Sequence, residues 1–219
     1  TEYGGAGMDN VTYVLAMIAI SKACASTGVI VSVNNTLYGF PVKTYGTHEQ
    51  KLEFLAPVAG GQVEGCYALT EAGAGSDAAS LSCRAELKGD KFIVNGTKRF
   101  ITNGGVARYC VLAATTDPSR GYKAIINLLV DLKNTPGFSI GKIEEKMGIL
   151  ASSTAELVFE DAEVPAENLL GKEGQGFRQM LSGLDAGRIG IGAQACGIGK
   201  AALEDALLYA KERVQFGKP

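Results

Sequence analysis

The feature that most constrains the fold is the hydrophobic period, which changes twice along the chain. Residues 10 to about 62 show helical spacing, with capping-box spacing between Thr47 and Gln50 and a stop at Gly60-Gly61. From about 63 to 170 the period is two, and after "NLLGKEGQGF" it is helical again. The pattern predicts an α+β fold, with a helical first part, a central β region and a helical last part.

The central region is predicted to be antiparallel. Apolar residues alternate with polar ones at Leu81, Cys83, Ala85 and Leu87, and turns are expected at Gly89-Asp90 and Asn95-Gly96. Further short strands are predicted in "ARYCVLAATTDP", "AIINLLVDL" and "TAELVFEDAEVP". Because no long helix separates these strands, the region indicates an antiparallel β-barrel or sandwich and not a Rossmann unit.

The last region carries an apolar stripe that is interrupted by a charge. The stripe residues are Phe177, Leu181, Leu184, Ile191, Ala195, Ile198 and Ala202. Arg188 lies on the same stripe, either as a local i,i+3 ion pair with Asp185 or as a cation that reaches a ligand at the edge of a groove. Six glycines accompany the stripe, at 183, 187, 190, 192, 197 and 199. They indicate a closely approaching helix or flat ligand, or a break into two helices.

Composition excludes several classes of protein. The 21 Lys and Arg against 23 Asp and Glu give no basic excess for nucleic acid. The weakly charged region 10–42 is too rich in polar residues, Gly and Pro for a membrane span, and we expect buried helix there. Five scattered cysteines predict buried, unpaired thiols, and with a start that lacks a signal core they predict a cytoplasmic protein. A single histidine, His48, disfavours a metal site.

The stretch "TEAGAGSD" (70–77) could form an anion-holding turn. Gly73 and Gly75 would let backbone N–H groups converge, and Ser76 would add a hydroxyl. An ordinary surface turn, with Asp77 as a turn or cap residue, is the alternative. "GKEGQG" (171–176) lacks the βαβ context of a dinucleotide fingerprint and indicates a loop before the last helical region.

Several segments together resemble the acyl-CoA dehydrogenase family, and most of all its bacterial short-chain, butyryl-CoA-type members. These segments are "YALTEAGAGSD", "GTKRFITNGG", "GILASSTAELVFEDAEVP", "GKEGQGF", "LDAGRIGIGAQACGIG" and "ERVQFGKP". The resemblance implies the end of an N-terminal helical domain (1–62), a middle β-domain (63–173) and the start of a C-terminal helical bundle (174–219). It also implies a fragment that lacks the first helices and most of the last domain.

The resemblance further implies sites for FAD and an acyl-CoA. The FAD-binding residues would be Tyr67, Leu69, Thr70, Gly75, Ser76, Phe100, Ile101 and Thr102, with Arg213, Gln215 and Phe216 reaching the FAD of a neighbouring subunit. Ser76, Asp185 and Arg188 would bind the CoA thioester. Phe100 stands where many relatives have Trp, so it would stack over a smaller area. A homo-oligomer, usually a dimer of dimers, is implied as well.

The implied reaction is α,β-dehydrogenation of an acyl-CoA, with electrons passed to an electron-transfer flavoprotein. The family's glutamate base lies in a "YEGT" motif or at the fourth position of "LDxxR"; the motif does not occur here and the position is Gly187. Glu71 and Glu204 match neither address. We therefore expect no catalytic residue in this chain, no turnover and weak FAD binding. The alternatives are an acyl-CoA oxidase of the same fold and a non-catalytic module that binds CoA or flavin.

Overall fold

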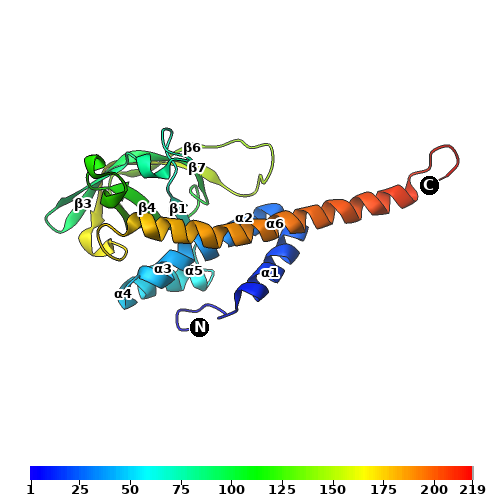
Figure 1. The fold of residues 1–219 in the computed structure, drawn as a ribbon, viewed down its shortest axis with the longest axis horizontal. Coiled ribbons are helices and arrows are strands. Elements are labelled where there is room, and N and C mark those ends of the chain that lie inside the picture. Colours follow the sequence, from blue (N-terminus) through cyan, green and yellow to red (C-terminus); the bar gives the residue numbers. More distant parts are fainter. Residues whose placement is uncertain (219) are drawn as a thin grey trace.

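The computed structural model describes residues 1–218. A curled sheet lies at one end, short helices lie beside it, and one long helix runs along the molecule and extends beyond it (Figure 1). The helices are α1 (Asn10–Ala23), α2 (Ala25–Ser32), the π-helix η1 (Val33–Gly39), α3 (Phe40–Tyr45), α4 (His48–Gln50), the π-helix η2 (Lys51–Leu55), α5 (Ala56–Ala59), the 3₁₀ turns η3 (Ala78–Ser80), η4 (Pro118–Ala124) and η5 (Ala166–Asn168), and α6 (Gly176–Glu212). The strands are β1 (Gly65–Ala68), β2 (Arg84–Lys88), β3 (Lys91–Thr102), β4 (Tyr109–Thr115), β5 (Ile125–Asp131), β6 (Phe138–Ile143) and β7 (Thr154–Pro165).

The N-terminal helices begin and end where their capping residues place them. The Asp9 carboxylate accepts the Thr12 N–H at 2.8 Å at the start of α1. The predicted capping box is confirmed, because Thr47 and Gln50 exchange side-chain to backbone hydrogen bonds. The stop is confirmed too: Gly60 is the C-cap of α5, and Gly61 takes a φ of +69°, which glycine adopts without strain.

The prediction that residues 10–42 are buried is wrong for α1. Only Met17 and Ser21 of this helix are buried, and Val11 and Leu15 are largely exposed. The helix packs against α6 along one face, and among the described residues nothing covers its other face. None of the described helices combines the length and apolar character that crossing a bilayer requires.

The β region forms one seven-stranded sheet in the order β1-β4-β2-β3-β7-β6, with β5 paired to β4. Most pairs are antiparallel, as predicted, but β4 runs parallel to β1, with Cys66 opposite Cys110, and parallel to β2, with Arg84 opposite Thr115. The parallel pairing with β1 arises because the β2–β3 hairpin intervenes before the chain returns alongside β1 as β4. The strand β6 was missed at the sequence level, because all but one of its residues are exposed and its side chains show no alternation of burial.

The two predicted turns have different outcomes. Gly89 has a φ of +65° in the tight turn between β2 and β3, which confirms the first. The prediction at Asn95-Gly96 is wrong, because these residues lie inside β3 at a shift in register with β7. There a Cβ on Gly96 would lie 2.8 Å from the Cβ of Cys83, so the glycine permits a close approach and makes no turn.

The main core lies within the curled sheet. It is built from the inward residues of the strands, among them Cys83, Ala85, Leu112 and Leu157. Leu87 continues the alternation of β2 but is exposed, although its cross-strand neighbour Phe92 belongs to this core. All five cysteines are free; Cys66, Cys83 and Cys110 are buried, whereas Cys24 and Cys196 are exposed, contrary to the prediction of buried thiols throughout.

The last region is a single 37-residue helix, α6, and does not break at its glycines. A Cβ on Gly197 would lie 2.5 Å from the Ile18 carbonyl oxygen, and one on Gly187 would lie 3.0 Å from a methyl of Leu37. The expected close neighbour is therefore a helix. The predicted stripe is not the main packed face: Leu181, Ile191 and Ile198 are exposed, because α6 turns Gly187 toward η1 and Gly190 and Gly197 toward α1.

Candidate functional site

Two adjoining cavities lie where α6 and η1 meet the ends of two strands. The β-side cavity has a volume of about 150 Å³ and the helix-side cavity one of about 300 Å³. Both are lined by Val33, Leu37 and Leu184, so the two cavities adjoin, and we call them together the slot. The slot has a sheet wall and a helix wall, and its shared residues are apolar.

The sheet wall comes from the ends of β1 and β3. Six residues that the sequence implicated line it: Tyr67, Leu69, Thr70, Phe100, Ile101 and Thr102. The Arg99 N–H donates to the Thr70 carbonyl oxygen at 2.7 Å, which ties the segment after β1 to the end of β3. The structure thus brings together side chains that lie about thirty positions apart in the sequence.

Phe100 occupies a strained position in this wall. Its φ is +57°, in the left-handed region that a bulky residue rarely adopts. The strain lies at a bulge, because the pairing of β3 with β7 shifts register between Lys98 and Ile101. The bulge leaves the ring of Phe100 60% exposed while Ile101 stays buried. A conformation of this kind costs about 1–3 kcal/mol and is commonest at ligand-binding sites.

Behind the sheet wall lies a buried ion pair that sequence reasoning missed. Lys98 is fully buried, and its Nζ donates to Glu71 Oε1 at 2.6 Å and to the Leu69 carbonyl oxygen at 3.0 Å. The other Glu71 oxygen accepts the N–H and hydroxyl of Ser82 at 2.7 and 2.6 Å, and Oε1 also accepts the Cys83 N–H. Lys98 is in phase with the buried Phe92 and Val94 of its strand, so a charge on the apolar face was the available signal, but only tertiary contact reveals its partner.

These contacts determine the charge state of Glu71. Burial raises the pKa of its carboxyl, but the Lys98 ammonium and the hydrogen bonds from Ser82 outweigh burial, and the net pKa lies below its ordinary value. Glu71 is therefore an ionised carboxylate whose acceptor positions are already filled. It is a structural anchor and is not free to act as a base.

The glycine corner is more open than the sequence suggested. Glu71 and Ala74 exchange backbone hydrogen bonds across the turn at 3.0 and 3.2 Å. A Cβ on Gly73 or Gly75 would meet no atom within 4 Å, so no part of the described chain requires glycine at either position. Gly75 and Ser76 are exposed and do not line either cavity. The corner nevertheless lies beside α6, because Ala74 packs in one cluster with Met180.

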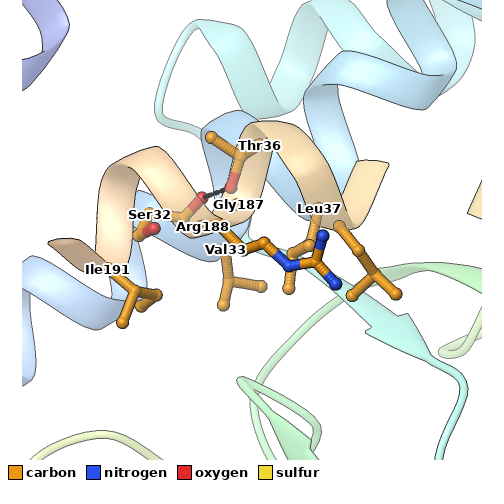
Figure 2. Close-up of a pocket in the computed structure, with 8 residues that line it drawn as sticks. Ser32, Val33, Thr36, Leu37, Gly187, Arg188 and Ile191 are labelled. Carbon is orange, nitrogen blue, oxygen red and sulfur yellow. Dashed lines mark hydrogen bonds between the residues drawn. The ribbon is translucent and has the colours of Figure 1, made fainter. Parts of the chain in front are cut away.

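The helix wall carries one charged side chain. Figure 2 shows Val33, Arg188 and Ile191 projecting to the same side of the crossing between η1 and α6. Arg188 also forms the predicted i,i+3 pair with Asp185, Nη1 to Oδ1 at 2.6 Å, and both side chains are more than 70% exposed. Both interpretations of Arg188 are thus compatible, since it pairs locally and lines the cavity. Asp185 itself does not line it.

The slot offers a planar ligand an apolar surface and a few hydroxyl groups. The Tyr67 hydroxyl is buried without a hydrogen-bond partner, and burial raises its pKa above the usual range. Such a group lacks the bond that a buried hydroxyl normally makes. Thr70, Thr102 and the ring of Phe100 line the same cavity. These residues fit a flat heteroaromatic ring system with a polar edge, such as the isoalloxazine of FAD. Within residues 1–218, no cluster of three or more His, Cys, Asp or Glu could hold a metal ion.

Three of the implicated residues lie away from the slot. Arg213 is the C-cap of α6, and Gln215 and Phe216 follow it in an exposed turn at the far end of the long helix (Figure 1). Phe216 is fully exposed. The last residue of the "ERVQFGKP" motif, Pro219, lies outside the described residues.

Three domain models of one known protein family match this chain. The family model for the acyl-CoA dehydrogenase N-terminal domain matches residues 1–62, the model for the middle domain matches 66–162, and the model for the C-terminal domain matches 174–219. The three matches follow one another in the order of a single family and cover most of the chain.

Individual relatives agree. The chain is 50% identical to the short-chain-specific acyl-CoA dehydrogenase of Clostridium acetobutylicum, over 99% of this chain and 57% of that protein. Butyryl-CoA dehydrogenase from Megasphaera elsdenii superimposes with a TM-score of 0.96 at 45% identity, over 100% of this chain and 58% of that one. A glutaryl-CoA dehydrogenase from Mycobacterium smegmatis, solved in complex with FADH2, gives 0.92 at 37%, over 99% and 54%.

The chain spans about 57% of the length of the short-chain relatives that it matches. Within that span, the three domain models match in the order of the family. The sheet and the long helix superimpose on those of butyryl-CoA dehydrogenase. The chain belongs to the acyl-CoA dehydrogenase family.

Proposed function

We propose that this chain forms the flavin-facing and acyl-CoA-facing part of an FAD-dependent short-chain acyl-CoA dehydrogenase, which introduces an α,β double bond into an acyl-CoA. One observation carries the proposal: six residues that the family resemblance assigns to FAD line a single cavity, and that cavity adjoins the one lined by Arg188. The names of the relatives, a short-chain-specific acyl-CoA dehydrogenase and a butyryl-CoA dehydrogenase, support the substrate class.

Different residues of the slot would bind different parts of the ligands. Thr70 and Thr102 would offer hydroxyl groups to the polar edge of the flavin, the backbone at Tyr67 and Leu69 would lie along that edge, and Phe100 would pack against the ring. When bound, FAD supplies the two-electron redox chemistry. Val33 and Leu37 would exclude water from the thioester, because they line both cavities with apolar surface.

The CoA end would lie toward the charged side chains. Arg188 is the only cation that lines either cavity among the described residues, and its pairing with Asp185 leaves it largely exposed to a ligand. Gly75 and Ser76 would contact FAD and CoA where these emerge from the slot, since the corner is exposed beside α6. These roles follow the resemblance, and the open space around Gly75 is compatible with them.

The chain offers no base for the α-proton. Gly187 occupies the fourth position of "LDxxR", and a Cβ there would already lie 3.0 Å from Leu37. Glu71 is committed to Lys98, and Glu204 pairs with Lys22 on the surface. We therefore expect the 219-residue chain to bind its ligands without turning them over.

The test is a titration of the 219-residue chain with FAD, followed by butyryl-CoA under anaerobic conditions. Weak FAD binding with perturbation of the flavin spectrum by butyryl-CoA, but no bleaching, supports the proposal. Bleaching would contradict the absence of a base. Absence of any FAD binding at millimolar concentration would count against a flavin slot.

Further features of the whole protein belong to the same proposal. The domain boundaries 1–62, 63–173 and 174–219, an electron-transfer flavoprotein as electron acceptor, and a dimer of dimers are what the family resemblance implies. The exposed positions of Arg213, Gln215 and Phe216 support a homo-oligomer, because residues so far from the slot could serve a neighbouring subunit. A cytoplasmic location suits five free cysteines. Size-exclusion chromatography with light scattering tests the oligomer.

A further inference from the structure

The buried ion pair between Lys98 and Glu71 lies directly behind the sheet wall of the slot and has no role in the proposed chemistry. The Lys98 side chain is fully buried and that of Glu71 is 6% exposed. Buried lysines and glutamates are uncommon because both charges lose their hydration. Because burying both charges is costly, we ask which part of the structure the pair holds in place.

The contacts of the pair converge on the segment that follows β1. Lys98 donates to the carbonyl oxygen of Leu69, a residue that lines the β-side cavity, and Glu71 lies one position beyond Thr70, which lines it too. Glu71 in turn accepts from the N–H groups of Ser82 and Cys83, immediately before β2. The pair therefore fixes both ends of the glycine corner through hydrogen bonds.

The same pair also lies where the strained bulge begins. Lys98 is the last residue of β3 paired with β7 before the register shift, opposite Leu157, and the strained Phe100 follows two positions later. Between them, the Arg99 N–H donates to the Thr70 carbonyl oxygen. One side chain thus links the Leu69–Thr70 edge of the slot to the Phe100–Thr102 edge.

We propose that Lys98 and Glu71 are positioning residues, which hold the two edges of the sheet wall in the geometry that receives the flavin ring. This inference rests on the proposed function, because it assigns the wall a flavin. Neither side chain lines the cavity, so each acts through Leu69, Thr70 and Phe100. The matched ionic pair at the far end of β3, Lys91 with Glu163 at 2.6 Å, is exposed and away from the slot.

The experiment separates positioning from general stability. The charge-free double variant Lys98→Met/Glu71→Gln removes the pair without leaving one buried charge, so it keeps the test valid if Lys98→Met alone does not fold. Val94→Ala, a fully buried position on β3 outside the slot, provides a destabilised control, and Lys91→Met provides the same substitution on the same strand. All variants are made in the 219-residue chain.

The first readout needs no cofactor. Amide hydrogen exchange of Arg99, measured by NMR, reports the bond to Thr70 that joins the two edges. We expect at least tenfold faster exchange at Arg99 in the double variant than in Val94→Ala, with amides of β4 and β5 unchanged between them. Equal Arg99 exchange in these two variants would overturn the inference.

The second readout is FAD affinity by fluorescence titration. We expect at least tenfold weaker binding for the double variant and unchanged binding for Lys91→Met and Val94→Ala. Unchanged affinity in the double variant would also overturn the inference. If the unsubstituted chain binds no FAD, the proposed function fails, while Arg99 exchange still decides whether the pair positions the wall.

Discussion

The two walls of the slot each carry an ion pair with a 2.6 Å contact, yet the pairs lie in opposite environments. In the sheet wall, Lys98 and Glu71 are buried and their hydrogen-bonding positions are filled by the chain. In the helix wall, Arg188 and Asp185 are more than 70% exposed, and α6 is held instead by close packing at its glycines. Contact distance alone therefore does not reveal function: the buried pair stabilises the wall, and the exposed pair is free to meet a ligand.

Breaking the buried pair should have the largest effect. Lys98→Met leaves the Glu71 carboxylate buried without its counter-ion, and we expect a loss of about 3–5 kcal/mol in the free energy of unfolding. Urea denaturation followed by circular dichroism measures it. A loss below about 1 kcal/mol would mean that the two walls do not differ as described.

Acid should weaken the same wall. Because the folded pKa of Glu71 is lowered, its contribution to stability is fully present above the unfolded pKa of about 4.3 and is lost as pH falls through the lower folded value. The stability difference between the unsubstituted chain and Glu71→Gln should therefore be largest near neutral pH and shrink below about pH 4. Denaturant titrations across this range measure the difference; a gap that widens toward low pH would contradict the assignment.

The effect of a glycine-to-alanine substitution in α6 on stability should depend on which face of the helix the glycine occupies. Gly197→Ala places a methyl 2.5 Å from the Ile18 carbonyl oxygen and should destabilise the fold by about 1–3 kcal/mol. Gly192→Ala, on the open face with no atom within 4 Å, should instead stabilise it by up to about 1 kcal/mol through helix propensity. Thermal unfolding of both variants gives the comparison, and the same sign for both would refute the glycine-packed face.

Breaking the exposed pair should have the smallest effect on stability. Arg188→Ala should change the free energy of unfolding by less than about 0.5 kcal/mol, because exposed pairs contribute little. The same variant should weaken binding of butyryl-CoA measured by isothermal titration calorimetry, with Lys200→Ala, farther along α6, as the control. A stability loss comparable to that of Lys98→Met would show that Arg188 is structural.

Much of the architecture followed from local pattern. The two changes of period, the capping box at Thr47, the stop at Gly60-Gly61 and the strands around Cys110, Ile126 and Leu157 all depend on neighbours in the chain. The turn predicted at Asn95-Gly96 was wrong because this dipeptide is typical of turns, whereas in the fold Gly96 lies at a register shift of β3, in close contact with Cys83. The apolar stripe on α6 did not predict the buried face for a similar reason, because the packing of the glycines against neighbouring helices decides which face is buried.

The sequence by itself determined the α+β class, the family resemblance and, through that resemblance, six of the nine residues that line the β-side cavity. It did so because these features reside in short segments whose spacing and chemistry can be read along the chain. Only the tertiary structure decided that Lys98 pairs with Glu71, that Phe100 is strained, and that Arg188 faces the slot while Gly75 and Ser76 lie outside its lining. Those properties depend on contacts between segments far apart in the sequence, and the burial that gives a charge its role exists only once these segments have packed together.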